Sequence, residues 1–108
     1  MPFDPAYGGG GFPWLMSIAL QEMLNSACMS FALCPLLTQG AIDLIHEHSD
    51  EAQKETWLRK LVSGEWSATM NLTEPDAGSD VGALRTKAEP VGDGTYKISG
   101  QKLSLIHI

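Results

Sequence analysis

The sequence predicts an α+β fold in which helices come first and strands follow. Apolar residues at helical spacing dominate residues 14–46, and a capped amphipathic segment follows at residues 50–64. After residue 66 the pattern changes to short alternating segments joined by an Asp-Gly turn, which is a strong β-hairpin signal. Helices followed by strands, with no internal repeat in the sequence, indicate an α+β arrangement.

The N-terminal half predicts two helices after a loop. Three prolines and four consecutive glycines leave Met1–Pro13 without regular structure. Trp14–Leu33 is apolar on most of its circumference, which is typical of a buried helix. Pro35 is expected to end or kink that helix, and a second helix is expected from Leu36 to about His46.

The third expected helix has signals at both ends. Asp50 followed by Gln53 fits an N-terminal capping box, and Gly64 stands where a helix-terminating glycine belongs. The apolar stripe between them consists of Trp57, Leu58, Leu61 and Val62.

The C-terminal part predicts strands. Ser67–Leu72 tends to alternate as a strand does, and Thr86–Glu89 and Thr95–Ser99 form the expected hairpin around Asp93-Gly94. So few strands leave an open edge and an uncovered apolar face, and the first helix is more apolar than three helices can cover. The sequence is therefore interpreted as a truncated part of a larger fold.

Composition excludes several function classes. The 108 residues are 44% hydrophobic and 19% charged, which is ordinary globular composition. The formal charge of −6 argues against non-specific nucleic-acid binding. The N-terminus lacks the pattern of a signal peptide and no segment predicts a membrane span, so a cytoplasmic location is expected. Cys28 and Cys34 are expected to be buried free thiols.

Several common sites are also absent from the sequence. His46 and His48 lie two residues apart, so on a helix they point about 200° apart and cannot share a metal ion. The glycine run Gly8–Gly11 has no strand before it and no Lys-Ser/Thr after it, so it predicts a surface turn rather than a phosphate loop. No hydrolase or phosphotransferase motif occurs.

The segment after Leu72 is the candidate ligand loop. Thr73 follows the expected strand, and Ala77-Gly78-Ser79 offers backbone N–H groups and a hydroxyl that could hold a phosphate oxygen. A turn rich in Asp and Ser that only joins two strands is an equally weighted interpretation. The residues alone leave both open.

Several motifs in order resemble the acyl-CoA dehydrogenase family. They are Tyr7–Gly11, which resembles a Y-G-G-x-G segment, Asp50–Trp66, Leu72–Asp80, Thr86–Ala88 and Gly92–Lys102. The resemblance runs from about Tyr7 to Lys102, nearly the whole chain. Residues 84–90 are most similar to the branch that contains 3-(methylthio)propanoyl-CoA dehydrogenases.

The resemblance implies three stretches. Residues 1–66 would form the end of a helical N-terminal domain, and residues 67–102 would begin a middle β-barrel domain. Residues 103–108 depart from the family pattern and resemble one reading frame of a sequencing adaptor, which marks them as an expected artefact.

The resemblance also implies an FAD site. Met70, Leu72 and Thr73 would lie along the flavin ring, and Gly78 and Ser79 would approach the pyrophosphate, with Ser79 also near the acyl-CoA. No catalytic residue is implied in this chain, because the family's catalytic glutamate belongs to a C-terminal domain. Glu74 is not its substitute, since it belongs to the cofactor-loop motif.

The implied function is that of an oxidoreductase of fatty acid metabolism. The parent flavoprotein would oxidise an acyl-CoA to its 2-enoyl-CoA and pass electrons to an electron-transfer flavoprotein, as a homo-oligomer. An acyl-CoA oxidase or a flavin monooxygenase of the same fold is the close alternative. A non-catalytic helical interaction module is the distant one.

Overall fold

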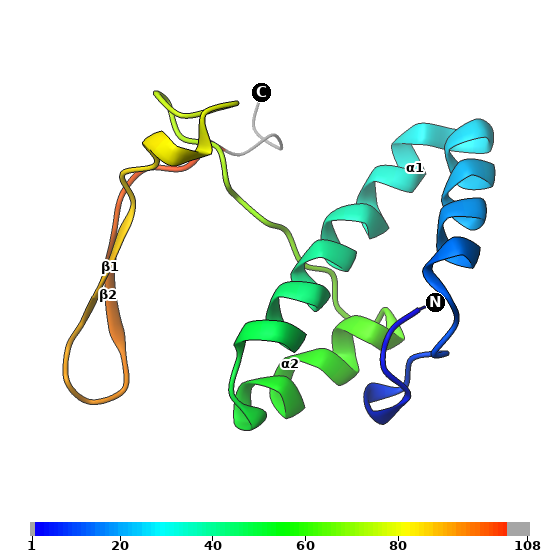
Figure 1. Ribbon diagram of the computed structural model, residues 1–108, viewed down its shortest axis with the longest axis horizontal. Helices are drawn as coiled ribbons and strands as arrows, with labels where there is room; N and C mark the ends of the chain where they lie inside the picture. The colour runs from blue at the N-terminus through cyan, green and yellow to red at the C-terminus, as the bar shows by residue number, and fades with distance from the viewer. Residues whose placement is uncertain (1, 104–108) are drawn as a thin grey trace. The chain divides into compact units, whose positions relative to one another are not determined.

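The chain consists of two compact units, one ending at Met70 and the other beginning at Asn71. The computed structural model describes residues 2–103. The first unit is helical and the second carries a two-stranded antiparallel sheet (Figure 1). This is the predicted α+β order. The expectation for the tail at residues 103–108 lies outside the described residues, apart from Leu103.

Helix α1, Trp14–His48, is a helical hairpin (Figure 1). Its backbone leaves the helical region at Cys28, with φ −161° and ψ 98°, and the two halves lie side by side. The Gln21 amide Nε2 donates to the Ala32 carbonyl oxygen across the halves at 3.4 Å. Just before the break, the Ser26 hydroxyl donates to the Glu22 carbonyl oxygen at 2.9 Å, a bond that often bends helices.

The expected break at Pro35 is wrong, because Pro35 lies inside the second half of α1. A proline in a helix interior costs about 3 kcal/mol through its lost N–H and a steric clash. Tertiary packing offsets this cost here, since the buried residues of α1 stand on both sides of the proline. They are Ala32, Thr38, Ala41 and Ile42.

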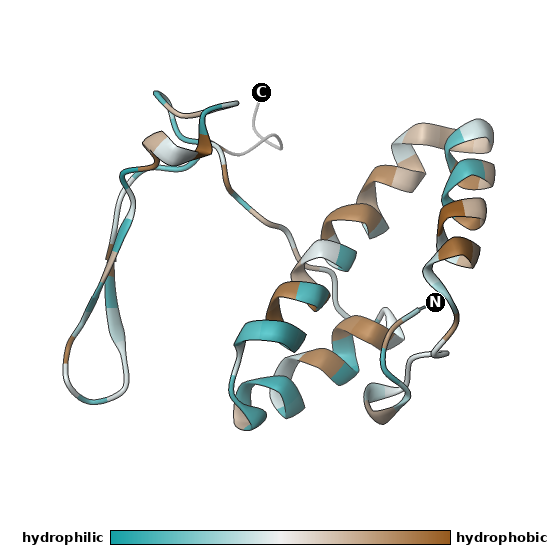
Figure 2. Cartoon of the chain, in the orientation of Figure 1, coloured by the Kyte–Doolittle hydropathy of each residue, from teal (hydrophilic) through white to brown (hydrophobic). Residues whose placement is uncertain are grey.

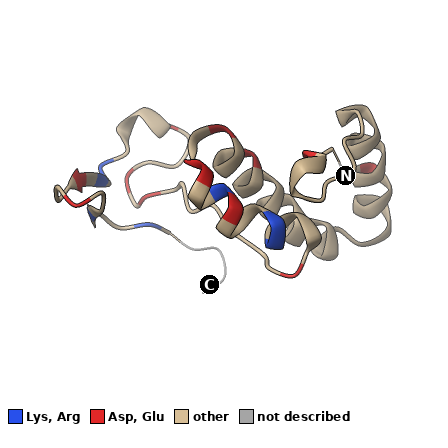
Figure 3. Ribbon diagram, turned by 90° about the horizontal axis from the view of Figure 1, so that it is seen from below, with Lys and Arg blue, Asp and Glu red and all other residues tan. Residues whose placement is uncertain are grey.

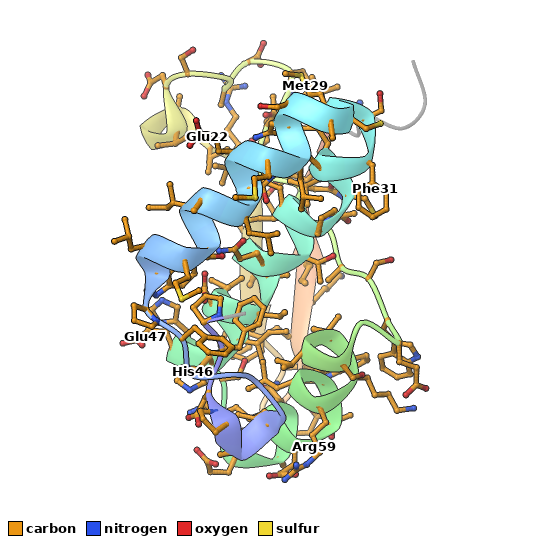
Figure 4. The ribbon with its side chains drawn as sticks, turned by 90° about the vertical axis from the view of Figure 1, so that its right-hand side faces the viewer. Glu22, Met29, Phe31, His46, Glu47 and Arg59 are labelled. Carbon is orange, nitrogen blue, oxygen red and sulfur yellow. The ribbon has the colours of Figure 1, made fainter. Side chains whose placement is uncertain are left out.

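The first half of α1 is not the buried helix that the sequence predicts. None of residues 14–27 is buried, and the Leu15, Ile18 and Met23 side chains are all more than half exposed. Figure 2 shows the apolar residues along both halves, and Figure 4 shows Met29 near the turn of the hairpin. Cys28 and Cys34 are free, as expected, but exposed rather than buried. The helical unit has too few elements to cover α1 on all sides.

Helix α2, Glu51–Ser63, confirms both predicted end signals. The Asp50 carboxylate accepts a hydrogen bond from the Gln53 backbone N–H at 2.8 Å, and Gly64 takes the left-handed conformation with φ 81°. Its apolar face builds the core with α1, where Phe3, Ile42, Leu58 and Leu61 meet. Figure 3 marks the charged residues along α2, of which Glu51, Glu55 and Arg59 are exposed.

The N-terminal segment is more ordered than the sequence predicts. A short 3-10 helix, η1 (Pro5–Tyr7), is capped by the Asp4 carboxylate, which accepts from the Ala6 N–H at 2.8 Å. A side chain on Gly9 would collide with the Phe3 carbonyl, so only glycine fits at this position. His46 Nε2 lies 3.3 Å from Asp4 Oδ2, which holds the segment to α1 (Figure 4).

By length and composition α1 could cross a membrane, with a mean hydropathy of 1.5 over its most apolar stretch. Core helices of soluble proteins pass the same test, so a single such helix is weak evidence. The reversal at Cys28 also divides it into two shorter helices.

The second unit confirms the predicted hairpin. Strands β1, Lys87–Pro90, and β2, Tyr96–Ser99, pair antiparallel, with Lys87 opposite Ser99. The turn closes with a hydrogen bond from the Val91 N–H to the Thr95 carbonyl oxygen at 3.0 Å. The expected strand at residues 67–72 is wrong, because these residues belong to no strand. A short 3-10 helix, η2 (Val81–Ala83), precedes β1.

Candidate functional site

The candidate loop folds back on itself around two buried residues. The Glu74 N–H donates to the Ala77 carbonyl oxygen at 3.0 Å, and the Ala77 N–H donates to the Glu74 carbonyl oxygen at 3.1 Å. Glu74 is 5% exposed and Ala77 2% exposed, while Pro75 and Asp76 between them are exposed. The loop is therefore a built turn and not a loose connection.

The Glu74 carboxylate ties this turn to two later segments. It accepts hydrogen bonds from the backbone N–H groups of Arg85 at 2.7 Å and Thr86 at 3.0 Å. The Lys102 ammonium donates to it at 2.9 Å and also donates to the Leu72 carbonyl oxygen at 3.0 Å. The buried Glu74 carboxylate thus contacts two residues 11 and 12 positions later in the sequence and a third 28 positions later.

These contacts fix the charge of Glu74. The Thr86 side chain next to the carboxylate, the Arg85 N–H and the Lys102 ammonium together lower the pKa of Glu74 to about 2. The Thr86 hydroxyl is buried and has no hydrogen bond of ordinary geometry within residues 2–103, whereas the Thr86 backbone N–H does donate to the carboxylate. Because a carboxylate of such low pKa holds a proton weakly, Glu74 is suited to anchoring the loop and not to abstracting protons.

The other two carboxylates of the loop also have structural partners. Asp80 caps η2, and its Oδ1 accepts from the Gly82 N–H at 3.1 Å. Asp76 Oδ2 lies 3.5 Å from the Arg85 guanidinium in an exposed ion pair. The fold of the loop therefore explains Glu74 and Asp80, while the exposed pair of Asp76 adds little.

The hydroxyls and two backbone amides of the loop are not used in this way. Thr73, Gly78 and Ser79 are exposed, and within residues 2–103 the side chains of Thr73 and Ser79 have no hydrogen-bond partner. The same holds for the N–H groups of Gly78 and Ser79 in that range. Apart from its chain neighbours, no atom of residues 2–103 lies within 4 Å of the position that a Gly78 side chain would take, so an incoming group has room there.

The predicted site residues fall into both units. Leu72, Thr73, Gly78 and Ser79 lie on the loop of the second unit, with Leu72 44% exposed. Met70 ends the helical unit and is 46% exposed. The large apolar side chains predicted to face a ring system are thus available at the surface of their respective units.

Sequence reasoning missed the residues that hold the loop. Lys102 lies in the Gly92–Lys102 motif. Nothing in the sequence predicts that it contacts Glu74, because the two residues are 28 positions apart. Thr38 was also missed, although its hydroxyl holds the segment that leads to Met70. Its only signal is a hydroxyl within an apolar helical stretch.

Comparisons with known proteins agree with the resemblance. The profile of the acyl-CoA dehydrogenase N-terminal domain matches residues 1–65. A 3-methylmercaptopropionyl-CoA dehydrogenase of Ruegeria pomeroyi is 55% identical over 97 residues, which cover 90% of this chain and 16% of that protein. A butyryl-CoA dehydrogenase of Syntrophomonas wolfei is 45% identical over 101 residues, covering 93% and 17%.

A short-chain specific acyl-CoA dehydrogenase of Clostridium acetobutylicum is 38% identical over 104 residues, which cover 95% of this chain and 27% of that protein. The chain thus spans 16 to 27% of the length of these relatives, and the similarity extends through both units. Together with the profile match, this similarity shows that the chain belongs to the acyl-CoA dehydrogenase family.

Proposed function

We propose that this chain forms part of the FAD site of an enzyme that oxidises an acyl-CoA to its 2-enoyl-CoA. The observation that carries the proposal is the division of roles in the loop at residues 72–80. Its Glu74 and Asp80 carboxylates accept backbone hydrogen bonds that hold the loop, while the hydroxyls and amides of Thr73, Gly78 and Ser79 remain exposed. Exposed donors beside an open glycine suit a phosphate-bearing ligand.

The residues present fit FAD. Thr73 would donate to the pyrimidine side of the flavin ring, with Met70 and Leu72 along the ring, and Gly78 and Ser79 would meet the pyrophosphate. The negative charge of Glu74 is balanced by Lys102 and that of Asp76 by Arg85, so these two of the three loop carboxylates oppose a second anion less. The third, Asp80, accepts a hydrogen bond from the Gly82 N–H. Ser79 would also lie near the acyl-CoA.

FAD supplies the acceptor for the β-hydride when it is bound. The residues of this chain would bind and orient it, and a carboxylate outside the chain would remove the α-proton. Glu74 is unsuitable as that base, because its pKa is about 2.

The remaining properties follow from the family and stay part of the proposal. Residues 67–102 would begin a middle β-barrel, in which other strands cover the exposed hairpin. Electrons would pass to an electron-transfer flavoprotein, and the parent enzyme would be a cytoplasmic homo-oligomer. Similarity to the Ruegeria pomeroyi enzyme favours a short thioether acyl group as substrate.

The test is a graft of residues 1–102 into the Ruegeria pomeroyi relative, in place of the matching segment. Thr73→Val and Ser79→Ala should each weaken FAD retention by about 1–3 kcal/mol, because each leaves a cofactor hydrogen bond unmade. Thr56→Val removes a hydroxyl from the exposed surface of α2 and serves as the matched control. If the graft holds FAD and both loop variants hold it equally tightly, the loop assignment is wrong.

A further inference from the structure

Thr38 makes an unusual contact within the helical unit. It lies on the second half of α1 and is 9% exposed. Its Oγ1 accepts a hydrogen bond from the Ala68 N–H at 3.1 Å and lies 3.2 Å from the Ala68 carbonyl oxygen, to which it donates. One hydroxyl thus satisfies both backbone groups of a residue thirty positions away.

This contact compensates for the missing strand. Residues 67–70 belong to no strand, so no neighbouring strand satisfies their backbone groups. The Trp66 N–H donates to the Lys60 carbonyl oxygen at 3.0 Å, and the Ala68 side chain packs against the core. Thr38 then fixes the Ala68 backbone, two residues before Met70.

A purely apolar residue would serve the core equally well at this position. Thr38 lies one turn from Ala41 and Ile42, which are both buried. Valine has the same shape and would avoid the cost of burying a hydroxyl. The hydroxyl also lies 3.5 Å from the Cys34 carbonyl oxygen within α1, but its two contacts to Ala68 are shorter, so its hold on Ala68 explains it best.

We propose that Thr38 is a positioning residue for Met70 at the flavin, an inference that rests on the proposed FAD site. Thr38 does not touch the cofactor. It acts through the Ala68 backbone, which lies two residues before Met70, whose side chain is 46% exposed.

The experiment compares Thr38→Val, which keeps the shape and loses the hydroxyl, with Thr38→Ser, which keeps the hydroxyl. Thr56→Val is the matched control, because its hydroxyl bonds only within exposed α2, to the Ala52 carbonyl oxygen at 2.7 Å. In the 108-residue chain, Thr38→Val should speed amide hydrogen exchange at Ala68 by roughly two- to tenfold relative to the Leu58 amide, since one net hydrogen bond is lost. Thr38→Ser should restore the protection.

The same variants in the graft test the role at the flavin. Thr38→Val should weaken FAD retention by roughly two- to tenfold and change the visible absorption band of the flavin, while Thr38→Ser and Thr56→Val leave both unchanged. Parental retention and spectrum in Thr38→Val would overturn the proposal. A loss in Thr38→Ser as large as that in Thr38→Val would also overturn it, because the hydroxyl alone would then restore nothing. If the unsubstituted graft holds no FAD, the proposed function itself fails, and this inference falls with it.

Discussion

Leu58→Ala tests the core on which the helical unit depends. Leu58 is fully buried and meets Phe3, Ile42 and Leu61, the other buried members of the core. Truncating a fully buried leucine costs about 3 kcal/mol, from lost burial and the cavity that remains. A unit of this size is stabilised by about 3–10 kcal/mol in total. Because its core is small, we expect the lower part of that range, so Leu58→Ala should remove most of the stability.

The measurement is urea unfolding of the 108-residue chain, followed by far-ultraviolet circular dichroism. Leu58→Ala should abolish the cooperative transition or move its midpoint far toward zero urea. Leu58→Met conserves volume and should cost less than about 1.5 kcal/mol. Leu44→Ala makes the same truncation at a side chain that is 52% exposed, and should cost at most about 1 kcal/mol. Equal losses for Leu58→Ala and Leu44→Ala would refute the assigned core.

Three further outcomes are expected. The isolated chain should associate, because α1 carries an open apolar hollow of about 440 Å³, lined by Leu15, Met16, Leu20 and Met23. A monodisperse monomer in size-exclusion chromatography would contradict this. The pKa of Glu74 is lowered from 4.5 to about 2, so its stabilisation of the second unit should be complete above about pH 4.5 and lost as the pH falls toward 2. An NMR titration of the Glu74 carboxyl with a midpoint near 4.5 would disprove the network. The 108-residue chain mixed with FAD and an acyl-CoA should not bleach flavin absorbance under anaerobic conditions, since it contributes no positioned base.

Local signals were the part of the fold that could be predicted. The Asp50 cap, the Gly64 terminus and the Asp93-Gly94 hairpin each depend on a few neighbouring residues, and the structure confirms all three. The hydrogen bonds and dihedral preferences that form these features involve only neighbouring residues, so they can be predicted without tertiary context.

The predictions that were wrong concern segments whose structure depends on contacts with residues far away in the sequence. Pro35 continues a helix because buried neighbours on both sides offset its local cost, and the reversal occurs at Cys28 without a proline or glycine. Residues 67–70 alternate like a strand but lack a partner strand, and a single threonine satisfies Ala68 instead. Neither outcome can be calculated from local propensity, because the deciding atoms lie many residues away.

The loop at residues 72–80 combines both situations. Its exposed hydroxyls could be identified as candidate ligand groups from the sequence, but the reason for three acidic residues beside them could not. A carboxylate in a predicted active site suggests a catalytic base, and burial would normally favour that role by raising its pKa. At Glu74 the hydrogen bonds from Arg85, Thr86 and Lys102 outweigh desolvation and drive the pKa the other way. The same burial that would make an isolated glutamate a base therefore makes this one an anchor.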